Sequence, residues 1–114
     1  MPDQVRCSHL LIKHIESRNP VSRRTGQQVT LTKAEAIAEL KGYEEAIKSG
    51  KADFFQEAAK RSDCSSYRNG GDLGPFGRNE MQKPFEEASF ALQVNEMSGI
   101  VDTDSGVHLI VRTG

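Results

Sequence analysis

The chain contains no tryptophan, only two tyrosines and only two cysteines among its 114 residues. Cys7 and Cys64 are too few for a disulfide framework, and they suit a reducing compartment. No apolar run reaches the roughly 18 residues of a membrane span, and the first residues lack the apolar stretch of a signal peptide. We therefore expect a cytoplasmic or nuclear protein that has no membrane partner.

The chain also lacks a large net charge, which is -1 at pH 7. Near-neutral charge, together with the scarcity of aromatic rings for stacking, argues against a nucleic-acid partner. The basic residues are nevertheless concentrated near the N-terminus, where Arg6, Lys13, Arg18, Arg23 and Arg24 outnumber Asp3 and Glu16. A local basic patch on a near-neutral chain suggests a specific site for an anion.

The composition fits one globular domain over residues 1–114, which we expect to be monomeric. Hydrophobic residues make up 36% of the chain and charged residues 27%, values that are typical of a folded domain. Val5–Lys13 reads as a buried central strand, because apolar residues occupy both of its faces. Residues 14–30 then form a long polar loop, which in a small domain is more often functional or mobile than neutral.

The helices follow from capping signals and apolar spacing. Thr32 and Glu35 form a capping box that opens a helix, and Gly50 ends it. Its core-facing stripe is Ala36, Leu40, Tyr43 and Ile47. Asp53 caps a second helix that ends near Ser62, with Phe55, Ala58 and Ala59 expected to face inward. Pro84 suits the first turn of a third helix, whose inner face carries Phe85, Ala88 and Leu92.

The remaining segments predict turns and a hairpin. Residues 63–79 are glycine-rich and read as turns. Ile100–Val101 and Val107–Arg112 read as strands joined by a turn over residues 102–106. One strand, three helices and a hairpin indicate an α+β domain with a small, mainly antiparallel sheet.

Two histidines interrupt apolar strands. His9 and His108 each read most simply as a core histidine whose ring nitrogens are hydrogen-bonded. If their strands are neighbours, the two rings can bond to each other, and burial would keep both neutral near pH 7. Such a pair is able to orient a polar group in a pocket.

Cys64 lies in the turn Ser-Asp-Cys-Ser-Ser, where it is either a packed loop residue or a thiolate activated by a nearby histidine. A cysteine hydrolase built on this thiol is one alternative, although the sequence offers no clear oxyanion-hole signature. Cys7, His9, His14 and Cys64 match no usual spacing of metal ligands, so we expect neither a metal nor a cofactor.

The basic loop permits a sharper interpretation. Lys13, Arg18, Arg23 and Arg24 are either a solvated surface or a phosphate site, because lysine supplies a point charge and arginine a planar fork. Leu73, Met81 and Phe85 are core residues by pattern, or they line a shallow apolar cup.

Five separated blocks of the sequence resemble the parvulin family of peptidyl-prolyl cis/trans isomerases. The blocks are Cys7-Ser-His-Leu-Leu, Ser62-Asp-Cys-Ser-Ser, Gly71-Asp-Leu-Gly-x-Phe76, the run from Met81 to Leu92, and Val101-x-Thr-Asp-Ser-Gly-Val-His108. They occur in the family's order and spacing, and they are most similar to the phosphorylation-directed (Pin-type) branch. The resemblance implies a parvulin-like, FKBP-like α+β fold, in which helices surround a four-stranded antiparallel sheet.

The resemblance also implies roles for individual residues. His9, Cys64 and His108, with Ser105 and Thr103, correspond to the family's catalytic centre. Leu73, Met81 and Phe85 correspond to the pocket for the proline ring, with Gln82 and Ser66 as adjacent polar contacts. Lys13 and Arg18 correspond to a phosphate clamp. Where relatives often have a second arginine, this chain has Asn19, so we expect either a weaker clamp or one that includes Arg23 and Arg24.

The resemblance implies an isomerase of X–Pro bonds with a role in protein folding, which acts without a cofactor and without a covalent intermediate. The expected partners are proteins with phosphoserine–proline or phosphothreonine–proline motifs. We expect no WW module, because the chain starts close to its first strand. The alternative outside enzymes is a phosphopeptide-binding module that does not catalyse.

Overall fold

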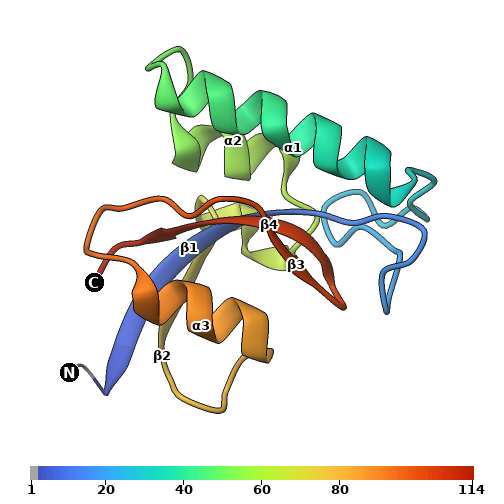
Figure 1. Cartoon of the computed structure of the whole chain (residues 1–114). Coiled ribbons are helices and arrows are strands. Elements are labelled where there is room, and N and C mark those ends of the chain that lie inside the picture. The colour runs from blue at the N-terminus through green and yellow to red at the C-terminus, as the bar shows by residue number, and fades with distance from the viewer. Residues whose placement is uncertain (1–2) are drawn as a thin grey trace.

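A four-stranded antiparallel sheet runs through the middle of the molecule (Figure 1). The structure is a computed structural model, and it describes residues 3–114. The strands are β1 (Gln4–Ile12), β2 (Asp72–Gly77), β3 (Val101–Thr103) and β4 (Gly106–Arg112), in the spatial order β2-β1-β4-β3. The central strands, β1 and β4, are the two whose residues are mostly buried. The expected α+β fold with four antiparallel strands is confirmed.

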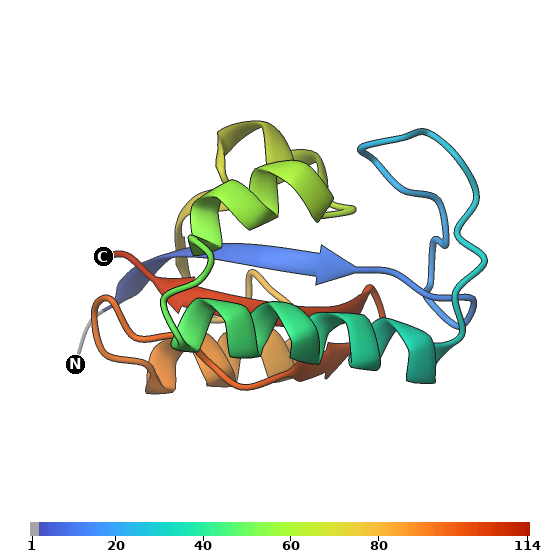
Figure 2. The same ribbon diagram turned by 90° about the horizontal axis from the view of Figure 1, so that it is seen from above.

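Helices cover both faces of this sheet. Helices α1 (Lys33–Lys48) and α2 (Phe54–Arg61) lie on one face and α3 (Lys83–Ala91) lies on the other (Figures 1 and 2). Alternate residues of β1 therefore enter different cores. Leu10 and Ile12 pack in the core under α1 and α2, whereas Val5 and Cys7 pack in the core under α3. The prediction of a central strand that is buried on both faces is confirmed.

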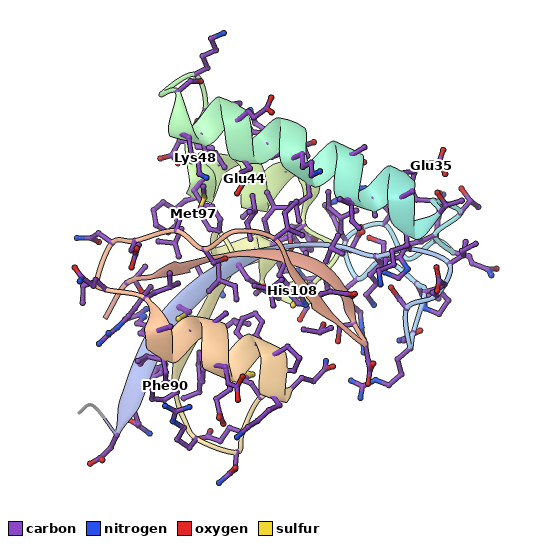
Figure 3. All side chains as sticks on the ribbon, in the orientation of Figure 1. Glu35, Glu44, Lys48, Phe90, Met97 and His108 are labelled. Atoms are coloured by element: carbon purple, nitrogen blue, oxygen red, sulfur yellow. The ribbon has the colours of Figure 1, made fainter. Side chains whose placement is uncertain are left out.

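Helix α1 begins and ends as its sequence predicts. The Thr32 hydroxyl accepts from Glu35 N, and the Glu35 carboxylate accepts from Thr32 N, which completes the capping box. Gly50 has a φ of 80° just beyond the helix, in the left-handed region that favours glycine. The exposed Lys48 forms an ion pair at 3.4 Å with the half-buried Glu44, and Met97 lies under the same end of the helix (Figure 3). Ala36 and Leu40 of the predicted stripe are buried in the core, and Tyr43 and Ile47 pack against it.

The inward face of α2 was only partly predicted. Asp53 caps the helix by accepting from Gln56 N, and Ala58 is buried, as expected. Phe54 is the buried aromatic residue, however, whereas Phe55 is 42% exposed and Ala59 is exposed. Residues four apart share a helix face, so burying Phe54 with Ala58 turns both of their successors toward solvent. The placement of Phe55 and Ala59 in the core was wrong.

Residues 63–79 contain more regular structure than their glycines indicate. Ser65–Asn69 form a 3₁₀ helix, and Asp72–Gly77 form the edge strand β2. Pro75 pairs with Arg6, whose N–H and C=O instead bond to Gly114 and Thr113. Pro75 therefore interrupts no hydrogen bond of the ladder, which is why proline is tolerated on an edge strand. Reading this segment only as turns was wrong.

The long polar loop lies beyond the end of β1 (Figure 2). It leaves the sheet after Ile12 and rejoins regular structure at α1. An isolated bridge between Val21 and Gln28 folds its distal part back on itself, and Ile15 N bonds to Leu31 O at its base. Over residues 3–114, no helix combines the length and the apolar character that a membrane crossing requires.

Candidate active site

A small cavity opens between the sheet and α3. It has a volume of about 200 Å³ and is lined by His9, Cys64, Leu73, Met81, Gln82, Phe85, Thr103, Ser105 and His108. We call these nine residues the central pocket. The fold thus brings together all the residues that the sequence assigned to a catalytic centre or a ring pocket. The cavity is smaller than the roughly 300–1,000 Å³ of sites for drug-sized ligands, and it suits one small ring.

The apolar side of the central pocket is formed by Leu73 from β2, Met81 before α3 and Phe85 within α3. Phe85 is 4% exposed, and its ring meets the ring of His108 edge-on at 5.1 Å and that of His9 at 5.5 Å. One aromatic side chain therefore belongs to both the core under α3 and the wall of the cavity. This sharing holds the wall rigid, since core side chains are closely packed.

The two histidines form the floor of the central pocket. His9 Nδ1 and His108 Nδ1 lie 3.0 Å apart, on paired strands, so one of these atoms donates a hydrogen bond to the other. His108 Nε2 lies 2.7 Å from Thr103 Oγ1. Burial, and then repulsion from His9 whenever that ring is protonated, hold the pKa of His108 well below its ordinary value. Figure 3 shows His108 on the side of the sheet that faces α3. The predicted histidine pair is confirmed, and His108 is neutral at pH 7.

The shared proton decides what His9 presents to the cavity. When His108 donates between the Nδ1 atoms, a neutral His9 carries its proton on Nε2; when His9 donates, its Nε2 is an acceptor. Within residues 3–114, His9 Nε2 is buried and has no hydrogen-bond partner. This atom is therefore free to respond to a polar group that enters the pocket, and the choice of donor can adjust to it.

Cys64 lines the central pocket together with His9, and it immediately precedes the 3₁₀ helix. Burial raises the pKa of the Cys64 thiol. The interactions of the thiol with His9 and Ser66 have the opposite effect and outweigh burial, so the pKa is lowered to about 6. A pKa of about 6 favours the thiolate over the thiol at pH 7, and a thiolate here adds negative charge at the edge of the pocket.

A chain of hydrogen bonds connects the central pocket to the polar loop. Gln82 Nε2 donates to Ser105 Oγ at 2.7 Å, and Gln82 Oε1 accepts from Asp104 N at 3.0 Å. Asp104 O in turn accepts from Arg18 N at 2.7 Å. The polar loop and the pocket are therefore neighbours, as a single binding groove requires. Gln82 and Thr103 also border a second cavity of about 590 Å³, which continues the groove past Asp102 and Asp104.

Lys13, which the resemblance assigns to a phosphate clamp, is enclosed by the loop. It is 6% exposed, and its Nζ donates to Asn19 O at 2.9 Å and to Val21 O at 2.7 Å. Burial and then repulsion from Arg23 lower the pKa of Lys13, while Asp63 and Cys64 act in the opposite direction. Two of its three N–H donors therefore hold the loop together, and one remains for a ligand.

The loop arginines surround this lysine. Arg18 and Arg23 are exposed and Arg24 is half-buried. Over residues 3–114, none of the three forms an ion pair with a carboxylate. Arg24 Nε is buried and has no hydrogen-bond partner in this part of the chain. The loop consequently presents uncompensated positive charge next to the central pocket.

Comparisons with known proteins agree with this geometry. Residues 9–114 match the family model described as "Rotamase: PPIC-type PPIASE domain". The chain belongs to the parvulin family of peptidyl-prolyl cis/trans isomerases.

Similar parvulins include a peptidyl-prolyl cis-trans isomerase NIMA-interacting 1 of Theileria annulata, 62% identical over 96% of this chain and 80% of that protein. Pin1 of Malus domestica is 60% identical over 98% of this chain and 95% of the relative. Among solved structures, the isomerase ESS1 of Candida albicans superposes with a TM-score of 0.96 at 49% identity, covering 98% of this chain and 63% of that chain. The protein is therefore a peptidyl-prolyl isomerase of the Pin1 type.

This parvulin domain depends on residues that sequence reasoning missed. Glu86 is 1% exposed and accepts hydrogen bonds from Asn79 N, Arg78 and Lys83. The bond from Asn79 N, opposed by burial and assisted by Arg78 and Lys83, lowers the pKa of Glu86. The carboxylate thereby fixes the turn that carries Met81 into the pocket. Nothing in the helical pattern distinguishes Glu86 from the exposed Glu87.

Gly71 is the second missed residue, although it begins one of the blocks shared with the family. Its φ is 88°, and an added Cβ would lie 2.3 Å from His9 O. Gly71 O also accepts from His9 N at 2.9 Å. The absence of a side chain therefore allows β2 to approach His9 closely enough to hold it in place.

Proposed function

We propose that this isomerase prefers X–Pro bonds preceded by phosphoserine or phosphothreonine, and that it twists the bond without forming a covalent intermediate. The adjacency of the cationic loop and the central pocket supports this proposal above all. Arg18 N reaches the pocket through Asp104 and Gln82. A phosphorylated residue and the proline after it are likewise direct neighbours in a substrate.

The charge of the loop favours phosphate over carboxylate. A phosphate ester carries about -1.5 to -2 charges at pH 7, while a glutamate carries one. The Lys13 ammonium, with one N–H free, and the exposed forks of Arg18 and Arg23 offer point-charge and planar contacts to it. Asn19 stands where an arginine would add a further positive charge to the loop. Arg23 and Arg24 supply charge from the far side of the loop instead.

The energy required for catalysis is modest. Rotation about an X–Pro bond crosses roughly 18–20 kcal/mol and takes tens to hundreds of seconds unaided. A turnover of about 10–1,000 per second requires the barrier to fall by about 4–7 kcal/mol. Preferential binding of the twisted amide is sufficient for this, because no bond has to break.

Each part of the pocket has a proposed role in binding the twisted amide more tightly than the planar one. Leu73, Met81 and Phe85 hold the proline ring, while the loop holds the phosphate, so rotation is confined to the bond between them. As the amide twists, it loses resonance and its carbonyl oxygen becomes less negative. We assign to the Cys64 thiolate the role of disfavouring the planar, more polar amide from the side of the carbonyl. The hydrogen bond between His9 and His108 can have either ring as its donor, so the pair adapts to the substrate carbonyl. Thr103, supported by Ser105, holds His108 in place.

The proposed substrates are phosphorylated proteins, and the wider cavity past Asp102 and Asp104 would accommodate residues that flank the proline. Free cysteines are compatible with the cytoplasm and nucleus as the sites of action. The carbonyl would lie close to the Cys64 thiolate, so adduct formation is the outcome to exclude. A Cys64–substrate adduct found by mass spectrometry would contradict the non-covalent mechanism.

Exchange NMR on three matched peptides tests the preference. The peptides contain phosphoserine–proline, glutamate–proline or alanine–proline in the same flanking sequence. We expect kcat/KM to fall in that order, with the difference carried mainly by KM. Equal values for all three peptides would refute the phosphate preference and leave a general isomerase. Binding of the phosphopeptide without faster exchange would indicate a non-catalytic module.

A further inference from the structure

Asp63 connects the cationic loop to Cys64, which lines the central pocket. It is 2% exposed, and its carboxylate accepts from Lys13 N at 2.9 Å, Ser22 Oγ at 2.7 Å and Arg61 Nη1 at 3.1 Å. Its backbone C=O also accepts from Arg23 N at 2.8 Å. The first and distal parts of the loop are thus tied to one residue, which directly precedes Cys64.

The tie through Ser22 extends to both neighbouring arginines. Ser22 Oγ donates to Asp63 and accepts from Arg24 N at 3.2 Å and from Thr25 N at 3.3 Å. Together with Arg23 N on the Asp63 carbonyl, these bonds determine the backbone path of the turn that carries the cationic side chains. The carboxylate of Asp63 therefore orients a segment about 40 residues away along the chain.

A carboxylate suits this position for electrostatic reasons. Lys13 and Arg23 repel each other, and a buried negative charge between their backbones offsets part of that repulsion. Arg61 is held on its other side by Glu39, with Nη2 at 3.2 Å from Oε1, so it stays with the helices instead of joining the loop. Replacing Asp63 by a neutral amide leaves the loop cations unbalanced and leaves fewer acceptor atoms for the three donors that it binds.

We propose that Asp63 is the positioning residue of the phosphate site: its buried carboxylate orders the Lys13–Arg24 loop before substrate arrives and holds it in register with the central pocket. This inference rests on the proposed phosphate preference. A preordered loop loses less conformational entropy on binding, so the contribution of Asp63 appears as affinity for the phosphorylated substrate. A peptide without phosphate does not use the loop and gains nothing from its order.

Two variants and a matched control test the inference. Asp63→Asn removes the charge and places an N–H₂ group against donors, while Ser22→Ala removes only the tie on the loop side. We expect Asp63→Asn to lower the ratio of kcat/KM for phosphoserine–proline over alanine–proline by about tenfold, mainly through KM, and Ser22→Ala to lower it by a smaller factor. The control, Glu44→Gln, removes one carboxylate charge from an ion pair with Lys48 on α1, and it should leave the ratio unchanged.

The outcomes separate this inference from the function on which it rests. A wild-type protein that shows no phosphate preference overturns the proposed function and the role of Asp63 with it. A wild-type preference that survives both substitutions, or a parallel loss on both peptides, overturns the role of Asp63 alone. If Asp63→Asn fails to fold, Ser22→Ala decides the question by the same ratio.

Discussion

The central pocket and the polar loop are adjacent, but they are held in place by different means. The pocket is built on paired strands and on an aromatic residue shared with the core, so its geometry depends on packing. The loop has the Val21–Gln28 bridge as its one strand-like pairing, and it depends on a few polar contacts to Lys13 and Asp63. Damage to the pocket should therefore affect stability and every substrate, whereas damage to the loop should affect only phosphorylated substrates.

The largest expected effect comes from Phe85→Ala, because Phe85 is both core and pocket wall. Loss of a buried phenylalanine typically costs about 3–5 kcal/mol in the free energy of unfolding. Activity should fall on alanine–proline and phosphoserine–proline peptides alike. Denaturant unfolding and exchange NMR measure the two effects. Phe55→Ala is the control, since Phe55 is 42% exposed. If Phe85→Ala lowered activity on phosphopeptides alone, the expected difference between pocket and loop would be contradicted.

A second test compares two glycines in similar backbone conformations. Gly71 has a φ of 88° and touches His9, whereas Gly74 has a φ of 73° and nothing within 4 Å of an added Cβ. Gly74→Ala should cost about 1–2 kcal/mol for the left-handed backbone alone. Gly71→Ala should exceed this cost and also lower activity on all peptides, because it displaces His9. Equal unfolding free energies for the two variants would show that the close contact has no importance.

On the loop, Arg18→Gln should act on one class of substrate only. Charge-assisted contacts are worth about 1.5–3 kcal/mol when they are well formed, so kcat/KM for phosphoserine–proline should fall about tenfold or more. Activity on alanine–proline and the unfolding free energy should stay near wild type, because Arg18 is exposed. Lys41→Gln, on the exposed surface of α1, is the control for net charge. A matching loss on alanine–proline would place Arg18 in the pocket machinery instead.

The smallest effect concerns the two cysteines, which represent opposite environments. Burial raises the pKa of Cys7, while the pKa of Cys64 is lowered to about 6. The alkylation rate of Cys64 should therefore rise as pH increases through about 6 and level off above pH 7, because only the thiolate reacts. Cys7 should stay unmodified while the domain is folded. Site-resolved mass spectrometry after iodoacetamide pulses measures both alkylation rates. If the alkylation rate of Cys64 had its midpoint near pH 8.5, Cys64 would be a thiol and not a thiolate at neutral pH.

Much of the fold could be predicted because local signals were strong. The Thr32–Glu35 capping box and the alternation in β1 each follow from a few residues near one another. Predictions were wrong where the deciding contact is distant. Phe54 is buried in place of Phe55 because of the sheet beneath α2, and β2 forms at Asp72–Gly77 because β1 offers an edge for it to pair with.

The site shows the same division. Side chains quoted from the family blocks meet in one cavity, and their proposed roles stay predictions. The resemblance placed Lys13 in a clamp but did not reveal that its ammonium also bonds to loop carbonyls. Asp63 was part of a quoted block, yet its importance comes from Ser22 and Lys13, which are 41 and 50 residues away along the chain.

By itself, the amino-acid sequence determined the helices, the two central strands and the side chains that supply the chemistry, because periodicity, capping and residue type act over a few neighbouring positions. Only the tertiary structure decided which buried polar groups bond to one another, which lysine is enclosed and which carboxylate holds the loop. Those choices depend on three-dimensional proximity between segments that no local pattern relates.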